Sequence, residues 1–117
     1  MITSSDQVWS FFIPPSEPNF VTQKSVVGRV RPARHEDDLA GAIVAIPGAD
    51  PGFDWLFGRG IAGFITCYGG VNSHMAVRAN ELGLPAVIGA GETLFAKWSA
   101  ARVLQIDCAN ERVTVLQ

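Results

Sequence analysis

The chain has 117 residues, of which 48% are hydrophobic and 17% charged, a balance typical of one folded domain and not of a disordered chain. The formal net charge of −2 and the lack of a basic patch with interleaved aromatic residues argue against nucleic-acid binding. The sequence shows no apolar stretch of membrane-spanning length and no leader-like N-terminus. These features predict a cytoplasmic protein with neither a membrane nor a nucleic acid as its partner.

The N-terminal segment differs from the rest of the chain. Bulky apolar residues at positions 8–13 precede the proline-rich stretch 14–19. Proline-rich composition favours an extended connector. We therefore expect residues 1–23 to be a linker or N-terminal extension and residues 24–117 to form the folded domain.

Two strands and a short helix are predicted next. Residues 25–31 alternate in polarity and end at Pro32, and residues 42–46 form a short apolar run. Asp50 and Pro51 suit the N-cap and the first position of a helix that includes Trp55–Phe57.

The strongest local pattern lies in the middle of the chain. The apolar run 61–67 predicts a buried strand, and residues 75–82 have helical spacing that ends at Gly83 and Pro85. Gly69 and Gly70 lie in the turn between them and would let backbone amides approach a bound group. The helical spacing places Met75, Ala76, Ala79 and Leu82 on the inward face, whereas His74, Arg78 and Glu81 share another face.

The remaining residues predict more strand than helix. Residues 85–89 form a short strand, residues 94–98 one helical turn, and residues 102–107 and 112–116 a hairpin joined by residues 108–111. Strands that alternate with helices and finish in a hairpin indicate an α/β fold with a mixed sheet and with helices on one side of it.

His74 is the main candidate for chemistry. It follows Asn72 and Ser73, either of which suits the N-cap. The first amides of a helix favour an anion, so a histidine at this position is a nucleophile whose phosphorylated form would be partly neutralised. Arg78 lies one turn later and either reaches a phosphate on His74 or is a solvated surface arginine.

The motif resembles a known family. Gly-Gly-Val-Asn-Ser-His at 69–74, with Glu-Leu-Gly-Leu-Pro-Ala-Val-Ile-Gly at 81–89, resembles the phosphohistidine swivelling domain of phosphoenolpyruvate-utilising enzymes. These include phosphoenolpyruvate synthase, pyruvate phosphate dikinase and rifampicin phosphotransferase. The resemblance spans about residues 24–116, and residues 50–53 are similar to the synthase and rifampicin phosphotransferase branch. Asn72 departs from the usual Thr, which is a regulatory phosphorylation site in some relatives.

The resemblance implies a layered β/β/α fold and a phosphoryl-carrier function. His74 would be the catalytic residue, and Gly69, Gly70, Asn72, Ser73 and Arg78 would support the phosphate. The carrier would shuttle phosphate between an ATP-grasp nucleotide-binding domain and a barrel that binds phosphoenolpyruvate or pyruvate. ATP and Mg²⁺ are expected at those partners and no cofactor or metal on this domain. The partners belong to the same polypeptide or to separate chains, and the domain should not turn over alone.

Two other functions stay open at this stage. The chain is alternatively a non-catalytic swivelling-type binding module with an idle histidine. A third possibility is a small metal-binding protein that uses His35 and His74. Three acidic residues follow His35, but no second histidine or spaced ligand near them supports a metal site there, and a solvated charged turn is the alternative. Cys67 and Cys108 lack zinc-type and Cys-x-x-Cys spacing, so we expect them to be a strand residue and a turn residue.

Overall fold

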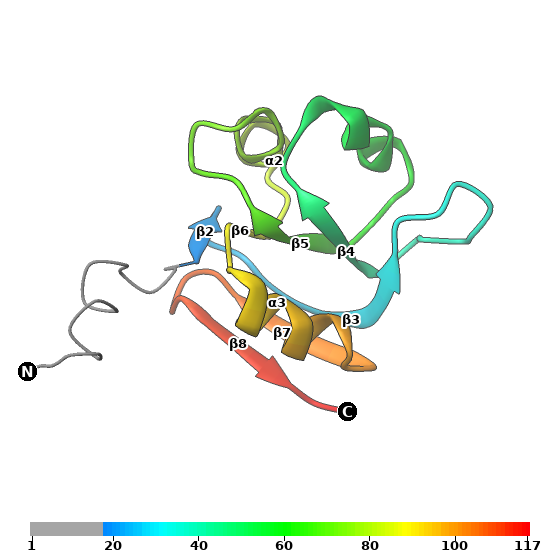
Figure 1. The fold of residues 1–117 in the computed structure, drawn as a ribbon, viewed down its shortest axis with the longest axis vertical. Helices are drawn as coiled ribbons and strands as arrows, with labels where there is room; N and C mark the ends of the chain where they lie inside the picture. The colour runs from blue at the N-terminus through cyan, green and yellow to red at the C-terminus, as the bar shows by residue number, and fades with distance from the viewer. Residues whose placement is uncertain (1–17) are drawn as a thin grey trace, which may run out of the picture.

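The computed structural model describes residues 18–117 (Figure 1). The apolar residues 8–13 and the prolines at 14 and 15, on which the predicted linker depends, lie outside the described residues. No helix within the described part is long and apolar enough to cross a membrane.

Seven strands form one sheet within residues 18–117, in the order β2-β6-β5-β4-β3-β7-β8. The strands are β2 (Asn19–Val21), β3 (Ser25–Pro32), β4 (Ile43–Gly48), β5 (Gly63–Tyr68), β6 (Ala86–Ile88), β7 (Val103–Asp107) and β8 (Arg112–Val115). The helices are the 3-10 helix η1 (Pro51–Gly58) and the α-helices α2 (His74–Leu82) and α3 (Glu92–Ser99).

The sheet is mixed, as the sequence predicts. Strands β3, β4, β5 and β6 run parallel to one another. At the edges of this group, β2 pairs antiparallel with β6, and β7 pairs antiparallel with β3. The predicted hairpin is also confirmed, since β7 and β8 pair antiparallel with Asp107 opposite Arg112. Helix η1 connects β4 to β5, and α2 connects β5 to β6.

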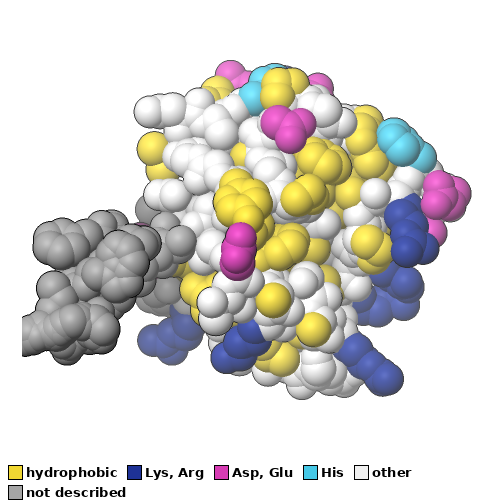
Figure 2. All heavy atoms as spheres, in the orientation of Figure 1, with side chains coloured by type: hydrophobic (Ala, Val, Ile, Leu, Met, Phe, Trp, Pro, Cys, Tyr) yellow, Lys and Arg dark blue, Asp and Glu magenta, His cyan; other side chains and the backbone are white. Residues whose placement is uncertain are grey.

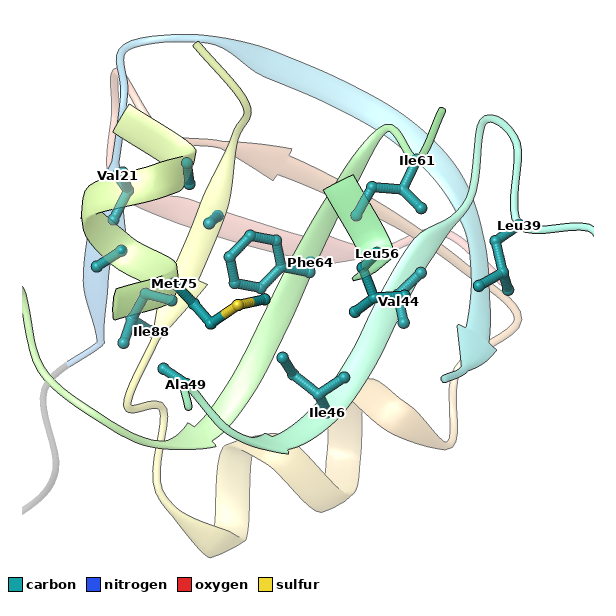
Figure 3. Packing of buried hydrophobic residues seen from close by; sticks show 13 residues of the cluster. Val21, Leu39, Val44, Ile46, Ala49, Leu56, Ile61, Phe64, Met75 and Ile88 are labelled. Carbon is teal, nitrogen blue, oxygen red and sulfur yellow. The ribbon is translucent and has the colours of Figure 1, made fainter. Parts of the chain in front are cut away.

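The helices cover both faces of the sheet, so the expectation of helices on one side is wrong. One apolar cluster joins α2 and η1 to β4, β5 and β6, with Met75 on one side of Phe64 and Leu56 on the other in Figure 3. A second cluster packs Trp98 of α3 against residues on the opposite face of the same strands, such as Ile65. Because β4, β5 and β6 are apolar at successive positions, both of their faces require cover.

Figure 1 shows the consequence of this arrangement. The sheet curls around α3, which contacts both β5 and β3 and lies between β5 and β8 in Figure 1, while α2 and η1 cover the other face. The observed layers fit the predicted α/β layered fold. Helix α3 spans two turns and not the single predicted turn, because it begins at Glu92 immediately after Gly91, whose φ is 86°.

Strand β2 is an addition to the predicted elements. Its residues pair antiparallel with β6, and the Asn19 side-chain amide donates to the Ile88 carbonyl at 3.2 Å. Without β2, strand β6 would be an open edge with unpaired backbone groups. The pairing therefore depends on a distant strand and leaves no signal in the local sequence.

Helix α2 confirms most of its predicted pattern. It ends at Gly83, which has the left-handed φ of 68° that a helix-terminating glycine adopts. Met75, Ala76 and Ala79 are buried as expected, but Leu82 is 53% exposed, so its expected inward position is wrong. Leu82 is the last helical residue, and the chain leaves the sheet face at that point.

The turn after β5 depends on one of its two glycines. Gly69 has a φ of 128°, and a Cβ added there would lie 2.7 Å from the Ala49 Cβ and 3.2 Å from the Ile88 Cγ2. Gly70 does not have a positive φ, and a Cβ there would meet nothing within 4 Å. The turn therefore requires a glycine at position 69 but not at position 70, while the predicted approach of their amides to a bound group stays a prediction.

We expect Gly69→Ala to lower the free energy of unfolding by about 2 kcal/mol, because the new Cβ meets both a clash and a disfavoured φ. The matched variant Gly70→Ala should change it by less than about 1 kcal/mol. Urea denaturation followed by circular dichroism measures both values. Equal losses in the two variants would contradict this account of the turn.

Candidate functional site

His74 is the first residue of α2 and lies where the turn from β5 meets the helix. Its side chain is 39% exposed, while the next two residues of the helix are buried. The position agrees with the helical spacing read from the sequence. The backbone position of His74 is thus fixed by the buried face of the helix, while its imidazole ring is accessible to another molecule.

Asp54 contacts the His74 ring and is the site residue that the sequence analysis missed. The Asp54 Oδ1 atom lies 2.8 Å from the His74 Nε2 atom, within hydrogen-bonding distance. Asp54 comes from η1, 20 residues earlier in the chain, and packing of η1 and α2 on the same sheet face brings the two together. The one available signal was the similarity of residues 50–53, which directly precede Asp54, to the synthase and rifampicin phosphotransferase branch.

Asp50 itself has the capping role that was predicted for it. Its Oδ1 atom accepts a hydrogen bond from the Gly52 amide at 2.8 Å, and Pro51 follows at the start of the helix. The Asp50 cap therefore determines where η1 begins and, through the helix, where Asp54 lies.

Arg78 lies on the same side of the site. Its Nε atom is 3.5 Å from Asp54 Oδ1, and its guanidinium lies over the Phe57 ring at 5.5 Å from the centroid. Glu81 is a more distant neighbour, at 3.9 Å from Nη1. The Arg78 Nε atom is buried and has no hydrogen-bond partner among the described residues. Arg78 is thus packed in place with a donor still available.

The start of α2 also leaves donors available. Ser73 occupies the N-cap position, but its hydroxyl donates to the Gly70 carbonyl at 2.7 Å and makes no capping bond to the helix. The expected side-chain cap by Asn72 or Ser73 is therefore wrong: within the described structure no side chain caps this helix. Uncapped amides at a helix start are suited to an anion.

Tyr68 is the last residue of β5 and lies where the turn toward α2 begins. Its hydroxyl donates to the Glu92 Oε2 atom at 2.6 Å, which ties the end of β5 to the start of α3. This hydrogen bond to Glu92 is the largest cause that raises the pKa of Tyr68 to about 12.

A second cluster lies beside η1. The His35 ring stacks on Trp55 with centroids 3.8 Å apart, and Arg59 lies over the same Trp55 ring at 4.9 Å. Arg59 also donates to the His35 carbonyl at 2.9 Å. Among residues 18–117 no group of three or more His, Cys, Asp or Glu side chains is arranged to hold a metal ion. His35 is therefore part of a stacked surface cluster.

The two cysteines are buried and unpaired with each other. Cys67 lies in β5 and Cys108 in the turn after β7, as the sequence predicts. Burial raises the pKa of the Cys108 thiol, which favours its neutral form.

Charge is unevenly distributed over the surface. In Figure 2, which has the orientation of Figure 1, acidic side chains lie mainly toward the end that carries α2 and η1, and basic side chains mainly toward the opposite end. The acidic residues near His74 include Asp54 and Glu81, with Arg78 between them. Arg78 is thus the cation closest to the ring among the ion pairs of the described residues.

Tyr68 offers a direct test of the turn, since it is the only tyrosine in the chain. Ultraviolet absorbance should show its phenol ionising with a midpoint near pH 12. Glu92→Ala removes the acceptor, so the midpoint should fall toward the ordinary value of 10.0. An unchanged midpoint would show that Tyr68 and Glu92 do not pair in solution.

The contact between Asp54 and His74 should contribute little to stability, because both side chains are well exposed. We expect Asp54→Ala to change the free energy of unfolding by less than about 1 kcal/mol. Denaturant titration at neutral pH measures this change. A loss of several kcal/mol would make Asp54 a structural residue.

Comparison with known proteins agrees with this geometry. A family model described as "PEP-utilising enzyme, mobile domain" matches residues 39–111, which is more than half of the chain. The matched region contains β4 through β7 and with them Asp54, His74 and Arg78. A comparison with curated protein sequences gives no match. The chain therefore belongs to the mobile-domain family of PEP-utilising enzymes, phosphoryl-carrier swivelling domains that work with the other domains of these transferases.

Proposed function

We propose that His74 is the residue that carries the phosphoryl group. The observation that carries the proposal is the exposed imidazole at the uncapped start of α2, in a chain of the mobile-domain family. The ring is accessible to a second domain, and the backbone around it offers unpaired donors to an anion.

The chemistry consists of two transfers in opposite directions. In the first, the lone pair of a ring nitrogen attacks phosphorus, the nitrogen–phosphorus bond forms, and the bond from phosphorus to the leaving oxygen of the donor breaks. In the second, an acceptor attacks the phosphorus and the imidazole leaves. Phosphoryl transfer depends mainly on positioning and on neutralisation of charge, so each partner site supplies these in turn.

This chain would supply part of that neutralisation. The amides at the start of α2 and the Arg78 guanidinium lie near the ring, and Gly69 allows the turn that presents the helix start. Gly70, Asn72 and Ser73 complete the turn, with Ser73 bonded back to the Gly70 carbonyl.

The partners would be an ATP-grasp nucleotide-binding domain and a barrel domain that binds phosphoenolpyruvate or pyruvate, as in the synthase, the dikinase and rifampicin phosphotransferase. ATP and Mg²⁺ would bind to those domains. The second partner would decide whether the final acceptor is water, inorganic phosphate, pyruvate or an alcohol. A carrier that visits both sites must move as a body between them.

A non-catalytic binding module is the second candidate function. The contact of Asp54 with His74 favours it, because that contact already gives the ring nitrogen a hydrogen-bond partner. In this case the histidine would be a surface residue and would take up no phosphate.

Incubation with radiolabelled phosphoenolpyruvate and a phosphoenolpyruvate-binding barrel domain separates the two functions. The carrier should take up a label that is lost in acid and stable in base, as expected of a phosphohistidine. His74→Ala should abolish the label, whereas His35→Ala should retain it, because these are the only two histidines in the chain. A label that survives His74→Ala, or no label on the unaltered chain, would support the binding module.

A further inference from the structure

The Asp54 carboxylate lies between the His74 ring and the Arg78 guanidinium. Its Oδ1 atom is 2.8 Å from His74 Nε2 and 3.5 Å from Arg78 Nε. A single anionic oxygen thus contacts the ring nitrogen and the nearest cation. This is the place that a phosphoryl group on Nε2 would occupy, since such a group is an anion joined to Nε2.

The carboxylate also affects the chemistry of that nitrogen. An ionised carboxylate has only acceptor atoms, so the contact at 2.8 Å requires a proton on His74 Nε2. In the neutral imidazole the lone pair is then on Nδ1. While the contact lasts, Nε2 has no lone pair with which to attack phosphorus.

The Asp54 and Arg78 side chains are similarly exposed, at 46% and 40%, but Arg78 has an additional contact with an aromatic ring. The Asp54 side chain is 46% exposed and its described polar partners are only His74 and Arg78. Arg78 packs over the Phe57 ring, and its buried Nε atom has no hydrogen-bond partner among the described residues. A phosphoryl group at the place of the carboxylate would bring three acceptor oxygens close to this donor, whereas Asp54 Oδ1 stays 3.5 Å from it without a hydrogen bond.

We propose that the Asp54 carboxylate takes the place of the phosphoryl group in the unphosphorylated chain. Asp54 contacts the His74 ring in that state and is displaced when Nε2 is phosphorylated. This inference rests on the proposed function. The ring first exchanges its Nε2 proton for one on Nδ1 through solvent. The Nε2 lone pair then attacks phosphorus, the bond from phosphorus to the leaving group breaks, and Arg78 passes from the carboxylate to the phosphoryl group.

Asp54 is thus a positioning residue that acts against phosphorylation. Its negative charge repels the incoming group, and its return to the ring after transfer favours departure of the phosphoryl group. The carrier would accept a phosphoryl group only at a partner site that compensates for the repulsion by Asp54. It would then release the phosphoryl group readily.

Phosphoramidate tests the proposal without a partner domain, because its phosphorus–nitrogen bond breaks as the histidine bond forms and ammonia leaves. ³¹P NMR follows the rate of uptake and distinguishes Nε2 from Nδ1 as the site. Asp54→Ala should be phosphorylated on Nε2 about fivefold faster than the unaltered chain. Glu81→Ala is the matched control: it removes a carboxylate that lies near Arg78 but makes no contact with His74, so its rate should stay within about twofold.

A second measurement reports on the ring itself. ¹⁵N NMR of the unphosphorylated chain should show His74 mainly with its proton on Nε2, and Asp54→Ala should shift the ring toward a mixture of both tautomers. A purely structural role of Asp54 would leave the tautomer unchanged.

The outcomes separate this inference from the proposed function. If the unaltered chain is phosphorylated but Asp54→Ala reacts no faster, or if the phosphate is on Nδ1, the role of Asp54 is overturned and the carrier function stands. If the unaltered chain takes phosphate neither from phosphoramidate nor from a partner domain, the carrier function itself is overturned.

Discussion

The site depends on the tight junction at the end of β5. Gly69 lies against Ala49 and Ile88, so the chain must leave the sheet there in a conformation that only glycine adopts readily. This junction determines where α2 begins, and His74 is its first residue. The Tyr68 hydroxyl bonds to Glu92 before Gly69, and the Ser73 hydroxyl bonds to the Gly70 carbonyl after it, so the turn is held on both sides.

The two crossover helices then place the groups around the ring. Both η1 and α2 pack on the same face of β4, β5 and β6, and their apolar residues share one core. Because the Asp50 cap and Pro51 fix the start of η1, Asp54 falls on the side of η1 that faces α2. Packing of Phe57 against Arg78 holds the cation at the same place. The proposed chemistry would therefore take place at surface side chains whose positions are determined by a buried core.

The residues that stabilise the fold are different from the charged residues around His74, an arrangement that suits a mobile domain. The residues that contact the ring are well exposed and make contacts of the kind that contribute little to folding. The fold is held by the two apolar clusters on either side of the sheet. A domain built in this way would keep its shape if its charged side chains changed partners, as the proposed carrier function requires.

Short-range patterns in the sequence were sufficient to predict the local elements and the position of the histidine. Apolar periodicity, the helix stop at Gly83 and the glycine turn act within a few residues, so β5, α2 and the final hairpin follow from them. The resemblance to the family added the prediction of an α/β layered fold. The exposed position of His74 followed from helical spacing alone.

Contacts between residues that are distant in the chain became visible in the folded structure and not before. The contact of Asp54 with His74, the pairing of β2 with β6 and the packing of α3 on the opposite sheet face each join segments that are far apart in the chain. The difference between Gly69 and Gly70 has the same origin, because it depends on Ala49 and Ile88. Local patterns carry no information on such contacts, since these depend on how the sheet curls and on which side chains the core leaves at its edge.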